Sequence, residues 1–452
     1  MNNLVQQTII VGGGFTGLFT ALHLSNNNYP YSIILIDRQE RFCFRPLLYD
    51  YFCNQMDANQ VRPNYEELLK GRNISFVKDN VESIDLEKQE VKLSSGTTCP
   101  YSNLVLGLGS VTGYFGVNGA KENALPFRGG KDAIALDHHL QNCLEKALST
   151  ANDQERHKLL TVAIVGGGPT GVELAATLAD LLPHWYEALG GKGEEIRMVL
   201  LNRGSEILKG DINDPLRNPA KNALEKRAVK VEMQMEAKVT AVHPNTLEYQ
   251  QNNQTKMIPT ATTVWTAGTA LNPVIQALPI QKEKRDKKGR LLVKPTQQLL
   301  DFPNVFAGGD CAAIQDHSYP PTAQVAYQQG KAIADNLERL ANGKEPKAAN
   351  ISIRGTLMKL GLQNGGANLF NEFEVNGEVA HLIRQATYLS LLPTPIHDFK
   401  ITLKWINDEI LQEYLEPEKA GNAVKWIAGG IVGIAVAKKL MEALSSDRNQ
   451  QT

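Results

Sequence analysis

The sequence predicts an α/β protein with two Rossmann-like dinucleotide-binding domains, one inserted into the other, and a smaller C-terminal α/β region. Three observations support this fold class. A G-x-G-x-x-G fingerprint occurs twice, each time between a buried-strand pattern and an apolar helix pattern. The length of 452 residues is enough for two or three domains with a large core. The composition changes near residue 350, where glycine-rich apolar segments begin.

The first fingerprint lies at the start of the chain, after a predicted strand at residues 8–11. Its glycines are Gly12, Gly14 and Gly17. In this pattern the first glycine permits a tight turn, the second lets a pyrophosphate approach the backbone, and the third lets helix and strand pack closely. The phosphates are expected at the helix N-terminus, which favours anions. A second strand, 32–36, leads to Asp37, which is placed to accept hydrogen bonds from ribose hydroxyls.

The segment after Asp37 is rich in aromatic residues and arginines. Arg38 and Arg45 are placed to reach the adenylate end of a dinucleotide, or else they lie in a solvated loop. Short strands are predicted at 74–77, 81–85 and 90–93. Residues 101–110 are predicted to form a buried strand whose glycine-rich end, including Gly109, brings backbone close to a ligand.

The second fingerprint follows a predicted helix at 136–151 and a strand at 162–165. Its glycines are Gly166, Gly168 and Gly171, and they lead into a predicted helix at 172–182. An inserted segment, 183–195, precedes the next strand, 197–201. Two nucleotide sites in one chain suggest a flavin that receives hydride from a nicotinamide cofactor.

The second unit lacks an acid at the end of its second strand and has Asn202-Arg203 instead. An acid there would select the 2′-hydroxyl of NADH. A neutral side chain beside an arginine suits a 2′-phosphate, so the sequence favours NADPH. The alternative is that Arg203 faces water and the site accepts either cofactor.

The rest of the chain has further strand patterns at 229–233, 237–242, 263–265, 290–293 and 304–307, of which the third and the last run into glycines. The third of these precedes Gly268, and the last precedes Gly309 and Asp310. A helix is predicted from about Pro320 to Leu340, because proline suits a first helical turn.

The C-terminal region has a possible helix at 397–406 and an apolar stretch at 423–439 that ends in lysines. The apolar stretch is expected to be either an in-plane membrane anchor, which we favour, or a helix packed on the protein's own core. No run of 18 apolar residues occurs, so no transmembrane span is expected. The first strand begins too early to leave room for a signal peptide.

The composition excludes several classes of protein. Lys and Arg number 47 against 48 Asp and Glu, which gives no basic surplus for a nucleic-acid partner. The five cysteines form no C-x-x-C pair, which argues against a zinc ribbon and a disulfide framework and suggests a reducing compartment. No metal site is expected.

Four segments carry a resemblance to a known family: VGGGPTGVELA at 165–175, WTAG at 265–268, NVFAGGD at 304–310 and PPTAQVAYQQG at 320–330. In this order they resemble the two-dinucleotide flavoproteins, and more closely the type II NAD(P)H:quinone oxidoreductases. Asn202-Arg203 and the short apolar C-terminus are similar to the demethylphylloquinone reductases, which prefer NADPH and reduce a naphthoquinone precursor of phylloquinone.

The resemblance implies FAD as cofactor, NADPH or NADH as co-substrate, and a set of site residues. The cofactor-binding residues would be Gly12, Gly14, Phe15, Thr16, Gly17, Asp37, Arg38, Gly109, Gly166, Gly168, Thr170, Gly171, Asn202, Arg203, Gly268, Gly309, Asp310, Ala323 and Gln324. Glu173 would approach the nicotinamide–flavin stack, and Gln324 and Gln328 would face the quinone. The two glutamines are i and i+4 on one helix face, where a solvent-facing polar stripe is the alternative. An ordinary first-turn acid is the alternative for Glu173.

The expected division is an FAD domain at 1–125 and 291–345, an inserted NAD(P)H domain at 126–290, and a C-terminal domain at 346–452. The expected activity is ping-pong, two-electron reduction of a membrane quinone without proton pumping. The protein is expected on the cytoplasmic face of a plasma or thylakoid membrane, bound peripherally, with a homodimer possible.

Three alternatives remain from the sequence. One is a respiratory NADH dehydrogenase that feeds the plastoquinone or ubiquinone pool. Another is a disulfide or sulfide:quinone reductase, which needs paired cysteines that this sequence does not offer. The third is a flavin-based redox sensor without steady turnover.

Overall fold

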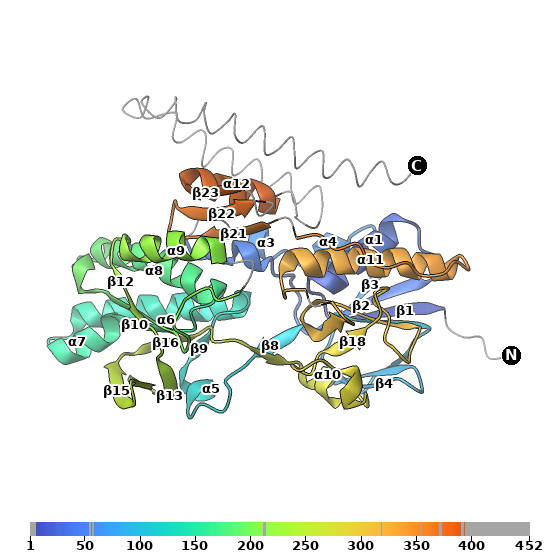
Figure 1. Cartoon of the computed structure of the whole chain (residues 1–452), viewed down its shortest axis with the longest axis horizontal. Helices are drawn as coiled ribbons and strands as arrows, with labels where there is room; N and C mark the ends of the chain where they lie inside the picture. Colours follow the sequence, from blue (N-terminus) through green and yellow to red (C-terminus); the bar gives the residue numbers. More distant parts are fainter. Residues whose placement is uncertain are drawn as a thin grey trace, which may run out of the picture.

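The structure is a computed structural model that describes residues 6–389, without 54–55, 57, 211–213, 318, 354 and 370–372, and also residue 393. The segments predicted at 397–406 and 423–439 lie outside the described residues. Two parallel five-stranded sheets stand side by side, and a third, smaller layer lies above them (Figure 1). The α/β fold class with two Rossmann-like units is confirmed.

The first sheet is built around the first fingerprint. In sheet order its strands are β19 (Val305–Ala307), β7 (Asn103–Leu106), β1 (Gln7–Val11), β2 (Ser32–Asp37) and β3 (Ile74–Lys78). All four neighbouring pairs are parallel. The central strand β1 is buried on both faces, as expected for a parallel sheet covered by helices. The sheet therefore joins the start of the chain to a strand about 300 residues later.

Two helices cross over this sheet, α1 (Phe15–Asn26) and α11 (Ala323–Ala341) (Figure 1). They approach closely because Gly330 has no side chain: an added Cβ there would lie 2.6 Å from the carbonyl oxygen of Thr16. The Thr20 hydroxyl donates to the carbonyls of Thr16 (2.8 Å) and Gly330 (3.0 Å). Thr322 caps the start of α11, where the sequence predicted a helix. The crossing places the N-terminus of α11 beside the first fingerprint.

The second sheet repeats the arrangement of the first. In order its strands are β12 (Val231–Gln234), β11 (Arg197–Leu201), β10 (Thr161–Val165), β16 (Thr262–Trp265) and β9 (Leu125–Pro126), again all parallel. Its helices are α6 (Gly130–Ser149), α7 (Asp153–Leu160), α8 (Pro169–Ala188) and α9 (Arg217–Glu225). The helix expected at 136–151 begins six residues earlier than predicted, and α7 was not predicted.

Helix α8 corrects the prediction that an inserted segment begins at Pro183, because the helix continues through this residue to Ala188. Proline has no N–H and leaves the carbonyl four residues earlier without its helical partner. Here that carbonyl belongs to Ala179, and it accepts instead from the backbone N–H of Val229 at 3.1 Å. The tertiary contact satisfies the oxygen that proline leaves free.

Smaller sheets decorate and connect the two units. They are β4–β5–β6 (Val81–Asp85, Glu90–Leu93, Thr98–Pro100), β13–β14–β15 (Lys238–His243, Thr246–Gln251, Gln254–Pro259), β8 with β17 (Ser110–Thr112, Thr269–Leu271) and β18 with β20 (Leu291–Val293, Ala312–Ile314). The hairpin β14–β15 was not predicted, because its residues are largely polar. The strand expected at 101–110 is divided into β7 and β8 by Gly107 to Gly109. The pair β8–β17 links the two large units.

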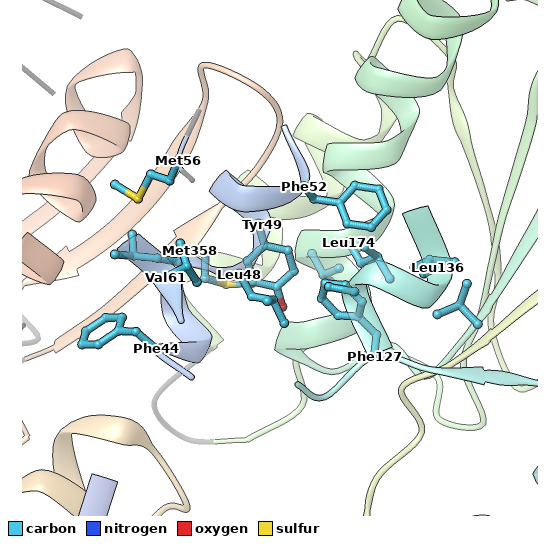
Figure 2. Packing of buried hydrophobic residues seen from close by; sticks show 14 of the residues in the cluster. Phe44, Leu48, Tyr49, Phe52, Met56, Val61, Phe127, Leu136, Leu174 and Met358 are labelled. Carbon is cyan, nitrogen blue, oxygen red and sulfur yellow. The ribbon is translucent and has the colours of Figure 1, made fainter. Parts of the chain in front are cut away.

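The remaining helices are short. They are η1 (Arg45–Leu47), α2 (Leu48–Phe52), α3 (Ala58–Val61), α4 (Tyr65–Leu69), α5 (Ala120–Asn123), η2 (Gly193–Glu195), η3 (Asp214–Leu216), α10 (Pro273–Ala277), η4 (Lys282–Lys284) and η5 (Gly309–Cys311). Among them α2 is the most deeply placed. Figure 2 shows its Tyr49 and Phe52 beside Phe127 and Leu174 of the second unit. The Phe127 ring lies 5.5 Å from that of Tyr49 and 6.1 Å from that of Phe52.

The third layer is an antiparallel sheet, β21 (Gly355–Lys359), β22 (Gly365–Leu369) and β23 (Phe373–Gly377), followed by α12 (Glu378–Leu389). It covers the junction of the two large units from above (Figure 1). Within the described residues no helix is both long and apolar enough to cross a membrane. The expected domain boundaries stay a prediction.

Candidate functional site: two nucleotide cradles and a buried charge cluster

The first fingerprint forms a tight cradle between β1 and α1. Gly12 has a φ of +97°, and an added Cβ would lie 2.5 Å from the carbonyl oxygen of Gly107. A Cβ on Gly17 would lie 1.9 Å from the carbonyl oxygen of Gly12. On Gly14 it would meet only the Gly107 oxygen, at 4.0 Å. Backbone therefore fills the space beside the first and third glycines, and the second faces the open mouth where a pyrophosphate would bind.

Asp37 closes the far end of this cradle. Its carboxylate accepts from the backbone N–H groups of Gly13 and Gln39, both at 2.7 Å. Burial raises the pKa of this carboxyl, and the two backbone hydrogen bonds and nearby Arg38 oppose that rise. Arg38 is exposed beside it, and Tyr65 donates to the Gly13 carbonyl at 2.6 Å. The acid is thus fixed at the strand end, with lone pairs left for ribose hydroxyls.

Two other predicted residues of this cradle use their side chains inside the protein. Phe15 packs against Phe42 and Phe44, with ring centroids 5.3 Å away in each case. The Thr16 hydroxyl donates to the carbonyl of Ala326 on α11 at 3.1 Å. These two residues therefore present backbone N–H groups rather than side chains at the start of α1.

The opposite wall of the first unit gathers Gly109, Gly309 and Asp310. The Ser110 hydroxyl donates to Asp310 Oδ2 at 2.6 Å, and the guanidinium of Arg128 contacts both the Ser110 hydroxyl and Asp310, the latter at 3.4 Å. Burial and the neighbouring charge of Arg45 lower the pKa of Arg128 to about 10. Arg128 was not predicted as a site residue, because it belongs to no recognised motif and lies in the second unit before α6.

Gln329 is a further residue that the motif did not identify as functional. Its side-chain oxygen accepts from the backbone N–H of Gly309 at 2.7 Å, and it is buried. It therefore fixes the glycine turn next to Asp310. Ala323, which begins α11, lies at the same edge.

The second fingerprint has the same glycine geometry as the first. Gly166 has a φ of +118°, and a Cβ on Gly171 would lie 1.9 Å from the Gly166 carbonyl oxygen. An added Cβ on Gly168 would meet nothing within 4 Å. The Thr266 hydroxyl donates to the Val165 carbonyl at 2.8 Å and so ties β16 to the turn. The second cradle therefore also has an open mouth at the N-terminus of its helix.

Asn202 takes the place in this cradle that Asp37 has in the first. Its Oδ1 accepts from the backbone N–H of Gly167 at 3.3 Å, as Asp37 accepts from Gly13. Its Nδ2 donates to the carbonyls of Gly204 (3.1 Å) and Glu206 (2.7 Å), which an aspartate could not do. The amide therefore holds the loop that carries Arg203, which is exposed.

Thr170 and Gly268 flank this second mouth. Thr170 lies in the first turn of α8, and the hydroxyl of Tyr49 hydrogen-bonds to its side chain. Gly268 follows β16, and its carbonyl accepts from the backbone N–H of Gly113 at 3.1 Å. Both lie where the second unit meets the first.

Glu173 lies one turn further along α8 and is half-buried. Its Oε1 accepts from the backbone N–H of Lys359 on β21 at 2.9 Å, and its carboxyl also hydrogen-bonds to Tyr49. Burial raises the pKa of Glu173 to about 7, and the Lys359 N–H bond and the charge of Arg384 limit the rise. A carboxyl poised near neutrality between two nucleotide cradles is suited to proton exchange.

A buried ion cluster stands next to Glu173. Asp50 of α2 accepts from Lys359 Nζ at 2.9 Å and from Arg384 Nη2 at 2.6 and 2.8 Å. All three side chains are 0% exposed. They come from the first unit, β21 and α12, and the sequence offered no signal that would have paired residues more than 300 positions apart.

Gln324 and Gln328 lie on one face of α11, as the i, i+4 spacing predicts. Gln324 donates to the carbonyl of Gly355 at 2.9 Å. Gln328 donates to the Ser352 carbonyl and accepts from its N–H, both at 2.9 Å. Neither amide is part of a purely solvent-facing stripe, since both bind the segment that leads into β21.

The two cradles fit dinucleotides by the chemistry of their donor sets and by the space beside Gly14 and Gly168. The residues expected for FAD gather around the first and those for NAD(P)H around the second. Among the residues that the structure describes, no group of three or more His, Cys, Asp or Glu could hold a metal ion. All five cysteines are free.

Comparison with known proteins agrees with this geometry. The sequence profile of the pyridine nucleotide-disulphide oxidoreductase family matches residues 6–330, so the chain belongs to that family. The demethylphylloquinone reductase of Synechocystis is 33% identical over 411 residues, 88% of this chain and 95% of that protein. The type II NADH:quinone oxidoreductase of Mycobacterium tuberculosis is 32% identical over 351 residues, 75% and 74% of the two chains. Within the family the chain is therefore a type II NAD(P)H:quinone oxidoreductase.

A solved structure shows the same fold. NDH2 from Plasmodium falciparum, in complex with NADH, superposes with a TM-score of 0.78 at 19% identity, over 90% of this chain and 98% of that one. The chain uses FAD and NAD(P)H. When bound, FAD supplies the redox chemistry, as an acceptor of hydride and a donor of electrons. The recognition from sequence motifs is confirmed.

Proposed function

We propose that this enzyme prefers NADPH and reduces a naphthoquinone, of the demethylphylloquinone type, in the biosynthesis of phylloquinone. The observation that carries the NADPH preference is the amide of Asn202. It donates to two loop carbonyls, so the loop is held without an acid at the position where a 2′-phosphate would lie. Glu206 in the same loop is paired with Arg217 at 3.3 Å, and the exposed Arg203 directly follows Asn202, where its cation can serve a 2′-phosphate.

The quinone assignment is supported by the relative from Synechocystis, whose name specifies demethylphylloquinone. In this proposal Gln324 and Gln328 line the quinone side of the site, where an amide donates to a quinone carbonyl without adding charge. Both are close to β21 through their bonds to residues 352 and 355. Quinone binding would then exchange these bonds for bonds to the substrate.

Glu173 is the proton-exchanging group in this proposal. Quinone reduction consumes two protons, and a carboxyl whose burial raises its pKa to about 7 holds a proton for part of the time at neutral pH. Tyr49 connects Glu173 to Thr170 at the mouth of the second cradle. The role of Glu173 is therefore to bind and release a proton at its carboxyl.

The protein is proposed to act at a membrane surface, peripherally and on the cytoplasmic face, because its acceptor is oily. The support for this comes from the sequence alone, in the apolar stretch at 423–439 with its terminal lysines. A homodimer stays a proposal as well.

The decisive experiment compares kcat/KM for NADPH and NADH, with a demethylated naphthoquinone, plastoquinone and ubiquinone as acceptors. We expect at least a tenfold preference for NADPH and the highest rate with the naphthoquinone. A flavin absorption band that bleaches with NADPH and recovers with quinone would accompany it. A tenfold preference for NADH would reverse the cofactor assignment, and Arg203→Glu is expected to move the preference toward NADH.

A second candidate is an NADH dehydrogenase that feeds the plastoquinone or ubiquinone pool. It is favoured by the relative from Mycobacterium tuberculosis, which is named for NADH. The same comparison of cofactors and acceptors separates the two.

The role of Glu173 has its own test in Glu173→Gln, which keeps the shape and removes the ionisation. We expect quinone reduction to slow by about 10²–10⁴-fold, the range typical of a general acid–base group, and to lose its pH dependence near neutrality. Flavin reduction by NADPH should change much less. An unchanged quinone half-reaction in the variant would remove Glu173 from the proposed mechanism.

A further inference from the structure

The cluster of Asp50, Lys359 and Arg384 has two cations and one anion, all fully buried. Asp50 binds both cations, and its contact with Arg384 is double, at 2.6 and 2.8 Å. Buried charges are costly unless they are paired, so Asp50 determines where both cations point. Burial alone would raise the pKa of Asp50, but Arg384 and Lys359 hold it well below its usual range, which keeps this carboxylate ionised.

Two charges of this cluster act on Glu173: that of Arg384 lowers its pKa, and that of Asp50 raises it. Lys359 approaches Glu173 from β21 through its backbone N–H, and Asp50 and Tyr49 face it from α2. Arg384 and Tyr388 act on it from α12. Among the described residues no ion pair to Glu173 is formed, although two ammonium or guanidinium groups belong to the same cluster.

Two further titratable groups, the Cys53 thiol and the Tyr388 hydroxyl, also interact with the charges of this cluster, and burial raises the pKa of each. A third titratable group is His381 of α12. It is buried, and burial together with the charges of Arg384 and Lys359 lowers its pKa to about 3. It therefore stays neutral at the pH where the enzyme works. Within the part of the chain that the structure describes, Asp50 forms ion pairs in this cluster with Lys359 and with Arg384.

We propose that Asp50 is a positioning residue for the reaction: it binds both buried cations on its own carboxylate, keeps them from forming an ion pair with Glu173, and so leaves Glu173 free to exchange a proton. A salt-bridged Glu173 would remain a carboxylate throughout the reaction. Asp50 reaches no nucleotide cradle itself and acts through the two cations. This inference rests on the proposed role of Glu173 and adds the device that makes that role possible.

The proposal fits the way the cluster is assembled. Asp50 belongs to the first unit, Glu173 to the second, and Lys359 and Arg384 to the C-terminal layer. The carboxyl that exchanges protons is thus tuned only when all three parts are docked. Arg384 also donates to the carbonyl of Pro46 at 3.1 Å, so it is held by η1 as well as by Asp50 of α2.

The test is the titration of Glu173 in the purified holoenzyme, followed by infrared difference spectroscopy. The stretching band of the protonated carboxyl is assigned by its loss in Glu173→Gln. In Asp50→Asn the cations are released toward Glu173, and the midpoint of the Glu173 titration is expected to fall by about one pH unit or more. In Lys359→Met one cation is removed and the Asp50–Arg384 pair is kept, so the midpoint is expected to rise by about one unit. The pH profile of quinone reduction should move with it.

Lys92→Met is the matched control, because it removes the same charge from an exposed pair with Glu82. It should leave the midpoint unchanged. If Asp50→Asn fails to fold, as judged by flavin absorbance and thermal unfolding, Lys359→Met decides the question alone. No shift, or shifts of the same sign in both variants, would overturn the role of Asp50.

The two proposals fail in different ways. If Glu173→Gln keeps a normal quinone half-reaction, the catalytic role of Glu173 is lost, while the infrared shifts still report on Asp50. If the quinone half-reaction is lost in Glu173→Gln but the midpoint of the Glu173 titration is the same in Asp50→Asn and Lys359→Met as in the native enzyme, the role of Glu173 stands and the role of Asp50 is refuted.

Discussion

Asn202→Asp is the sharpest test of how the second cradle recognises its nucleotide. The change replaces one side-chain N–H₂ group with an oxygen and leaves the shape intact. The native Nδ2 donates to the carbonyls of Gly204 at 3.1 Å and Glu206 at 2.7 Å. In the variant a charged oxygen faces two carbonyl oxygens, while the acceptor for the Gly167 N–H remains. The change therefore acts on the loop and not on the glycine turn.

The expected magnitude follows from these two bonds. Each hydrogen bond contributes about 0.5–1.5 kcal/mol net, so the closed loop loses about 1–3 kcal/mol before any repulsion is added. At about 1.4 kcal/mol for a factor of ten, NADPH binding should weaken by roughly tenfold to a hundredfold. NADH binding should weaken less, because it brings no 2′-phosphate near the new carboxylate.

The assay combines the KM for NADPH and NADH with hydrogen exchange of residues 203–208, which should become faster in the variant. Asn304→Asp is a matched control, since Asn304 also donates to a carbonyl, that of Ser102 at 3.0 Å, but in the first unit. It should lower stability and leave both KM values unchanged. If Asn202→Asp retains the native KM for NADPH and native exchange of the loop, the reasoning about this amide is wrong.

Three further predictions follow from single contacts. In Gly171→Ala the new Cβ would lie 1.9 Å from the Gly166 carbonyl oxygen, so NAD(P)H reduction of the flavin should be lost while the flavin spectrum is retained, as measured by stopped-flow absorbance. Trp265→Phe removes the indole bond to the Gly113 carbonyl at 2.8 Å and should cost about 1–3 kcal/mol in urea unfolding, since a buried oxygen is left without its donor; unaltered stability would contradict this. Burial and the charges of Arg384 and Lys359 lower the pKa of His381 from 6.5 to about 3, so between these values the unfolded chain binds a proton at this histidine and the folded chain does not. The free energy of unfolding should therefore fall as the pH drops below about 6.5, and His381→Gln should reduce this dependence on pH.

Much of the fold was accessible from sequence because its signals are local. Each glycine fingerprint, with its flanking strand and helix, depends on backbone geometry within about 30 residues, and both cradles formed where predicted. The family recognition also rested on short segments, one of which, at 165–175, contains the second fingerprint. The helix end predicted at Pro183 was wrong, because the Ala179 carbonyl that the proline leaves without a helical donor accepts from the N–H of Val229, a residue distant in the sequence.

The same distinction between local signals and distant contacts applies to the residues of the site. The sequence by itself determined the nucleotide cradles and the helix face of Gln324 and Gln328, since these follow from spacing. Only the tertiary structure decided that Asp50 would meet Lys359 and Arg384, and that Glu173 would lie half-buried beside them. The physical reason is that a buried charge is defined by its partners and by the exclusion of water, and both exist only after distant parts of the chain have packed.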